Sequence, residues 1–149
     1  MSDVRIYVTE QERILNEWQE RLGLQDWAIT LQYNCTPEEL KLSDVDGEAD
    51  WVTSTKSATI RILGKKYYGD RNEPYDFEST LVHELLHLKF SMLDLDGNSY
   101  ETTLLENLIH QMIDDIARAL VMAKRWELKR PLSLRIVDMK ERREKDEEV

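Results

Sequence analysis

The sequence predicts an α+β domain in which a small, three-stranded antiparallel sheet packs against helices. An amphipathic helix near the N-terminus, three short segments with strand periodicity and two longer helical segments after them support this fold class. The 149 residues suffice to bury one core and are too few for two comfortable domains. We expect a single domain over residues 1–134, with the charged residues 135–149 as a C-terminal helix or frayed tail.

The first helix is expected over residues 9–22. Thr9 can serve as its N-cap, with Glu12 completing a capping box, and Gly23 supplies a stop signal after its last turn. Its apolar residues recur at spacings of three and four, as one buried helix face requires. They are Ile14, Leu15, Trp18 and Leu22.

Three strands are expected after this helix. Residues 27–33 alternate apolar and polar side chains, the period of a half-buried strand. A polar loop over residues 36–50 follows, with Gly47 as its turn residue. Residues 51–55 and 58–62 then predict a hairpin.

Two helices complete the predicted fold. Asp76 can cap a helix that runs to about Leu93, and the turn formers of residues 94–98 break it. One long amphipathic helix is expected from about Ser99 to about Lys124. Its apolar residues are Leu105, Leu108, Ile109, Met112, Ile113, Ile116 and Leu120.

Charge and composition narrow the classes of partner. The formal net charge of −10 repels phosphate, so we expect no nucleic-acid partner. Residues 1–10 lack the apolar run of a signal peptide, and no segment has the ~20 apolar residues of a membrane span. The single Cys35 cannot form an intramolecular disulfide, which fits a reducing compartment. These features predict a cytoplasmic protein without a membrane anchor.

Residues 83–87 read His-Glu-Leu-Leu-His inside the first of the two later helices. Residues four apart share one helix face, so His83 and His87 can each aim a ring nitrogen at one ion ~2.0–2.1 Å away. Glu84, rotated by ~100°, can instead reach a water molecule at the open side of that ion. The pattern predicts a divalent metal site, most simply zinc, with two satisfied core histidines as the alternative.

A third ligand is needed, because catalytic zinc sites use three protein ligands and keep a fourth position open. Glu106 and His110 stand one turn apart at the border of the apolar face of the last helix. A reversal at residues 94–98 would bring this border back over His83 and His87. Both residues are therefore candidates.

The pentapeptide, its helix and the returning Glu resemble the zincin metallopeptidases, and more narrowly the gluzincins. This similarity spans about residues 57–124 and is specific only in the pentapeptide. It implies His83 and His87 as zinc ligands, Glu84 as general base and Glu106 as the preferred third ligand. The order of elements also looks like a minimal zincin fold, as in small intracellular zincins of the ImmA/IrrE and SprT-like kinds and in phage-encoded metallopeptidases.

One position departs from the gluzincin pattern. Where gluzincins often have an Asp one turn after the ligating Glu, this chain has His110. His110 is therefore either a hydrogen-bonding partner of a ligand or the true third ligand, as in zincins that use three histidines. Asp114, another turn along, is either a partner for a ligating histidine or an exposed helix acid.

The resemblance implies a zinc-dependent peptidase. The ion would acidify water and polarise a carbonyl, while Glu84 takes the water proton and passes it to the leaving amine. Its substrate would be a peptide or protein, held in extended form along residues 58–62 as an edge strand.

Two other classes stay open: a non-catalytic zincin-fold protein that binds metal or regulates a partner, and a metal-dependent hydrolase of something other than peptides. Glu84 favours an enzyme, because a structural metal site has no use for an acid at that position. The sequence gives neither the cleavage preference nor the oligomeric state.

Overall fold

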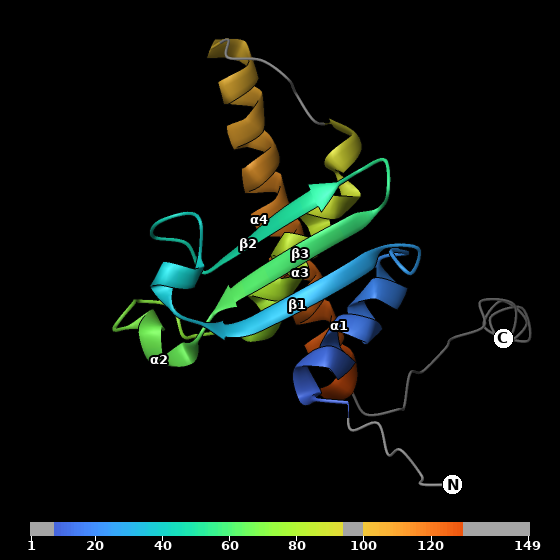
Figure 1. Cartoon of the computed structure of the whole chain (residues 1–149). Helices are drawn as coiled ribbons and strands as arrows, with labels where there is room; N and C mark the ends of the chain where they lie inside the picture. Colours follow the sequence, from blue (N-terminus) through green and yellow to red (C-terminus); the bar gives the residue numbers. More distant parts are fainter. Residues whose placement is uncertain (1–7, 94–99, 130–149) are drawn as a thin grey trace, which may run out of the picture.

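The computed structural model describes residues 8–93 and 100–129. Four α-helices, three strands and two short 3-10 helices follow one another along this part of the chain (Figure 1). They are α1 (Glu10–Arg21), β1 (Ala28–Cys35), η1 (Pro37–Glu39), β2 (Gly47–Val52), β3 (Ser57–Leu63), α2 (Lys65–Tyr68), α3 (Phe77–Lys89), η2 (Ser91–Leu93) and α4 (Tyr100–Lys129).

The sheet is mixed, so the prediction of an antiparallel sheet is wrong in this respect. The strand order is β1-β3-β2, with β3 parallel to β1 and antiparallel to β2. Alternating side chains identify strands but not their order. The connection between β1 and β2 is long enough to skip one strand position, and the hairpin then inserts β3 into that gap.

The predicted hairpin is confirmed, but its position in the sheet is not as expected. β2 begins at Gly47 rather than at Trp51, so residues 47–50 are strand and not loop. β3 is the central strand, which means that residues 58–62 cannot form an edge. The two edges of the sheet are β1 and β2.

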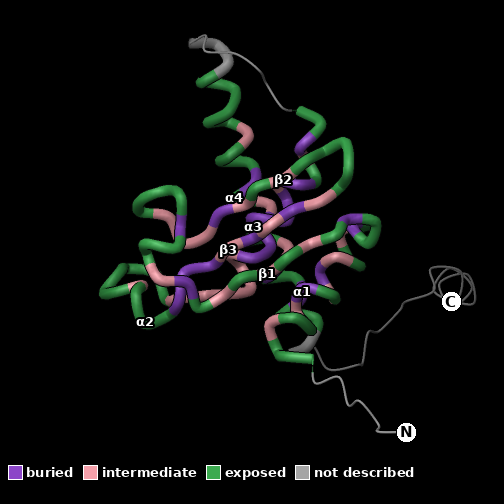
Figure 2. Tube along the Cα trace, viewed as in Figure 1, coloured by how far each residue is buried: buried purple, intermediate pink, exposed green. Residues whose placement is uncertain are grey.

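Helices α3 and α4 lie behind the sheet as it is drawn in Figure 1, and α1 packs against α3. The capping box at the start of α1 is confirmed, because the Thr9 and Glu12 side chains bond each other's backbone amides. A continuous core joins the helices and the sheet (Figure 2). Its fully buried large side chains include Trp18, Ile60, Ile62, Leu81, Leu85, Leu88 and Ile113.

The helix boundaries differ from the predictions in three places. α3 ends at Lys89, four residues before the predicted Leu93, and η2 follows it. α4 continues to Lys129, five residues past Lys124. The short helix α2 lies between β3 and α3, where no helix was predicted. The predicted turn at 94–98 and tail at 135–149 lie outside the described residues.

Only part of the apolar set predicted for α4 reaches the core. Ile113 is fully buried, whereas Leu105, Leu108 and Met112 are 44–52% exposed. These residues lie on a different face of α4 from Ile113, and this face points away from the core. Within the described ranges, no helix is both long and apolar enough to cross a membrane.

Candidate metal centre

The start of α3 is fixed by its cap and by α4. Asp76 accepts hydrogen bonds from the backbone N–H of Ser79 at 3.1 Å and from its hydroxyl at 2.9 Å. The Arg125 guanidinium of α4 binds the same carboxylate through two nitrogens, at 2.8 and 2.9 Å. This double fixation sets which face of α3 points at α4, and that face carries His83 and His87.

Three histidines converge between the two helices. His83 and His87 come from α3 and His110 from α4, and one ring nitrogen of each lies within 4.8 Å of the others. The Nε2 atoms of His83 and His87 are 3.1 Å apart. Nitrogens that bind one tetrahedral zinc at ~2.0–2.1 Å stand ~3.3 Å apart, so the spacing of the His83 and His87 nitrogens is close to the one that zinc requires.

Glu106 does not belong to this cluster. It lies one turn before His110 on α4 and is exposed. Of the two candidates for third ligand, the structure thus brings only His110 to the α3 histidines. Whether Glu106 or His110 reaches the α3 histidines depends on where α4 crosses α3. The sequence does not specify that crossing point.

Asp114 holds His83 in place. Its Oδ1 lies 2.7 Å from Nδ1 of His83, so that Nδ1–H donates to the carboxylate and Nε2 keeps its lone pair. Of the two interpretations of Asp114, a histidine partner or an exposed helix acid, the structure supports the contact with a histidine, because His83 donates to its carboxylate. A carboxylate behind the imidazole is the usual way to orient a metal-binding histidine.

Burial keeps the imidazoles of His83 and His87 neutral. Desolvation lowers the pKa of His83, and desolvation together with the neighbouring His83 and His110 lowers the pKa of His87 to about 4. Trp51 of β2 covers His87 with a nearly parallel ring, 6.1 Å between centroids. Neutral imidazoles are the form that binds metal, so no proton has to be displaced at neutral pH.

Glu84 is buried beside the histidines, with 5% of its surface exposed. Desolvation, followed by repulsion from Glu48 and Asp114, raises its pKa to about 8. A cation held by the histidines would favour the ionised carboxylate and lower this pKa towards neutrality. The group is thus suited to exchange a proton near pH 7.

The raised pKa of Glu84 predicts the pH dependence of stability in the metal-free protein. From pH 4.5 to 8 the folded state holds a proton that the unfolded state releases, so the free energy of unfolding falls as pH rises. His87 has the opposite effect, but only between about pH 4 and 6.5. From pH 6.5 to 8 we expect a loss of roughly 1–2 kcal/mol, measured by urea unfolding in the presence of a chelator.

Glu84→Gln is the control for that measurement. It should remove the loss between pH 6.5 and 8, because the amide does not titrate. An equal slope in the wild type and in the variant would assign the pH dependence to other groups.

Gly47 lets β2 approach α3 at this site. A Cβ at this position would lie 2.8 Å from Cγ2 of Thr80, 3.1 Å from Oε1 of Glu84 and 3.3 Å from the Arg61 carbonyl oxygen. Gly47 was predicted to be a turn residue, whereas it is the first residue of β2 and its lack of a side chain allows the close approach to α3. A glycine that opens an alternating run, as in residues 47–51, is the signal that could have indicated this.

Gly47→Ala should therefore destabilise the protein by about 1–3 kcal/mol, because α3 or β2 must move to admit the methyl group. Urea unfolding measures this loss. Adding Thr80→Ser removes the nearest atom and should restore part of the stability. A Gly47→Ala variant as stable as the wild type would contradict the close packing of β2 on α3.

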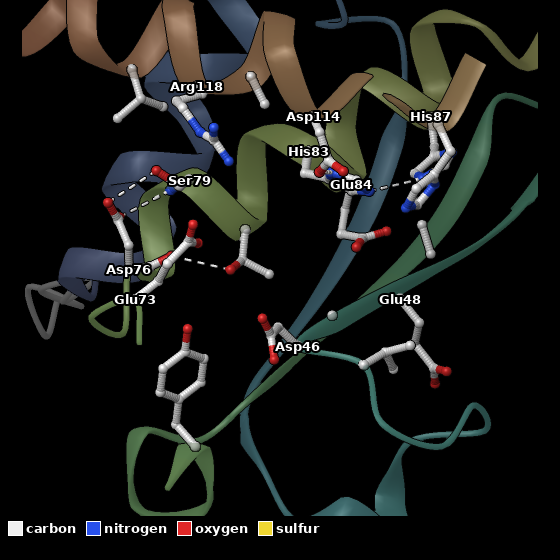
Figure 3. A pocket seen from close by; sticks show the side chains of 18 of the residues that line it. Asp46, Glu48, Glu73, Asp76, Ser79, His83, Glu84, His87, Asp114 and Arg118 are labelled. Carbon is white, nitrogen blue, oxygen red and sulfur yellow. Dashed lines mark hydrogen bonds and ion pairs between the residues drawn. The ribbon is translucent and has the colours of Figure 1, made fainter. Parts of the chain in front are cut away.

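The histidines and Glu84 open into a cavity of about 740 Å³ between β2, α3 and α4 (Figure 3). Asp46, Glu48 and Trp51 line its β2 side, and Asp114 and Arg118 line its α4 side. Sequence reasoning missed Trp51 and Arg118 as parts of the site, since nothing local marks them.

No family model, curated protein or solved structure matches this chain. The arrangement of side chains must therefore carry any functional argument.

Proposed function

We propose that this protein is a zinc-dependent peptidase with His83, His87 and His110 as metal ligands and Glu84 as general base. One observation carries the proposal: three imidazoles and one buried carboxylate meet at the wall of a single cavity. A purely structural zinc site is usually closed by four protein ligands. Among the residues that the structure describes, only three histidines form this cluster, and the cluster borders a cavity. This arrangement supports a catalytic site instead.

Zinc bound there would supply Lewis-acid chemistry, lowering the pKa of water and polarising a substrate carbonyl. Glu84 accepts the proton of the attacking water and delivers it to the leaving amine. Asp114 keeps His83 in the tautomer that presents Nε2. Trp51 shields His87 from solvent, which strengthens electrostatic interactions at the site.

The substrate would lie along β2. This strand is an edge of the sheet, and its residues Gly47 to Ala49 and Trp51 line the cavity. The free edge of a strand offers backbone groups to an extended peptide, which antiparallel pairing can hold. β2 therefore replaces residues 58–62 as the proposed peptide-binding edge.

The test is hydrolysis of peptides in ¹⁸O-labelled water. The zinc-loaded protein is incubated with a mixture of unstructured peptides, and mass spectrometry detects new C-termini that carry solvent oxygen. We expect cleavage by the zinc form, and none after chelation or with Glu84→Gln. Bound zinc without any cleavage would contradict the peptidase proposal and favour a non-catalytic metal-binding protein.

A further inference from the structure

Helix α4 carries a second apolar stripe that residues 8–93 and 100–129 leave uncovered. Leu105, Leu108, Met112, Met122 and Trp126 are 44–67% exposed. With the exposed Asp115 and Ala119 they complete an unbroken series of spacings of three and four from residue 105 to residue 126. The proposed peptidase site uses none of this series, although Met122 also borders the cavity.

The spacing indicates what kind of surface the stripe fits. A strict repeat of 3.5 residues keeps one seam of a helix against another helix over several turns. The residues that α4 buries in its own domain, Ile113, Ala117, Val121 and Lys124, lie on a different face. The stripe is therefore suited to a further helix rather than to a small ligand.

The stripe is long enough for a specific interface. Its 22 residues extend over ~33 Å of a helix ~10 Å wide. A seam of that size buries on the order of several hundred Å² per chain, near the lower range of specific dimers. It also exceeds the single apolar side chains that ordinary surfaces expose.

We propose that a second copy of this chain covers the stripe, with the two α4 helices antiparallel. In one antiparallel register, the residues along the stripe of one copy complement those along the stripe of the other. Leu108 then meets Trp126 of the second copy, Met112 meets its Met122, and Asp115 meets its Ala119. Four of the five apolar residues of the stripe pair with one another, and the acid faces the smallest side chain, as a two-fold symmetric interface requires. Leu105 lies at the end of the seam, outside these pairs.

Asp115 disfavours the other arrangements. In a parallel pair it would face the Asp115 of the second copy, placing like charges together in the seam. In the two antiparallel registers shifted by one heptad, it would face Met112 or Trp126 and leave a carboxylate against an apolar side chain. The heptad position of a single acid thus selects both orientation and register. The inference does not depend on zinc or on catalysis.

Sedimentation equilibrium of the full chain between about 5 and 200 µM tests the dimer. We expect a mass about twice the 17.7 kDa of one chain at the upper concentrations. Met112→Glu should give the mass of one chain throughout. Met92→Glu is the matched control, because Met92 is 86% exposed but lies outside the stripe, and it should keep the dimer. A wild-type monomer at all concentrations, or a dimer that survives Met112→Glu, would overturn the proposal.

Disulfide trapping tests the orientation. Met112→Cys and Met122→Cys chains are mixed and treated with a mild oxidant, with the wild type, whose Cys35 is buried, as blank. The antiparallel register predicts cross-linking in the mixture and little in either variant alone, where equal positions stand ~15 Å apart. Efficient cross-linking of Met112→Cys with itself would show a parallel pair and overturn the proposed arrangement.

Discussion

Replacing His110 with alanine is expected to lower the zinc affinity by roughly 100-fold or more, whereas Glu106→Ala should bind zinc like the wild type. Removing a residue that merely orients a metal ligand already lowers the metal affinity about 10- to 100-fold. Removing a ligand itself should lower the metal affinity further. The prediction follows from the position of His110 beside His83 and His87 and the exposure of Glu106. Competition with a chromophoric chelator measures both affinities.

Gln111→Ala is the matched control for this comparison. Gln111 is exposed, adjacent to His110 and absent from the cluster. The zinc affinity of Gln111→Ala therefore shows only the general effect of a substitution on α4. If Glu106→Ala lost zinc while His110→Ala kept it, the gluzincin arrangement implied by the sequence resemblance would hold instead.

Glu84→Gln is expected to reduce kcat by roughly 10²–10⁴-fold while the zinc content stays unchanged. The amide preserves the shape of the side chain but cannot accept the water proton, and general base catalysis contributes about that factor. Glu84 is close to the histidines and buried, yet it is not one of the clustered ligands. Steady-state kinetics on a cleaved peptide, with zinc measured in the same samples, separates turnover from metal binding.

Glu73→Gln serves as the control, because Glu73 lines the same cavity but is exposed and away from the histidine cluster. Its kcat should remain within a few-fold of the wild type. A Glu84→Gln enzyme with wild-type kcat would remove Glu84 from the mechanism and would contradict the assignment of its role.

Local sequence signals predicted those parts of the structure that local physics determines. The capping box of Thr9 and Glu12 appears as expected, and so does the cap of α3 at Asp76. His83 and His87 face each other because residues four apart share a helix face. Asp114 was assigned a possible role for the same reason, since it follows His110 by one turn.

Features that depend on how elements meet were not predictable in this way. The insertion of β3 between β1 and β2 leaves no trace in the alternation of side chains. The choice of His110 over Glu106 as neighbour of the α3 histidines depends on where α4 crosses α3. The exposure of Leu105, Leu108 and Met112 depends on which face of α4 meets the core, and the core takes the face that carries Ile109 and Ile113.

The most direct test of the metal centre is the zinc content of the wild-type protein by elemental analysis, after zinc loading and removal of the excess. The arrangement of His83, His87 and His110 predicts one zinc per chain, lost in His83→Ala. A wild-type protein that retains no zinc would contradict the proposed site and leave three histidines that serve only to pack α3 against α4.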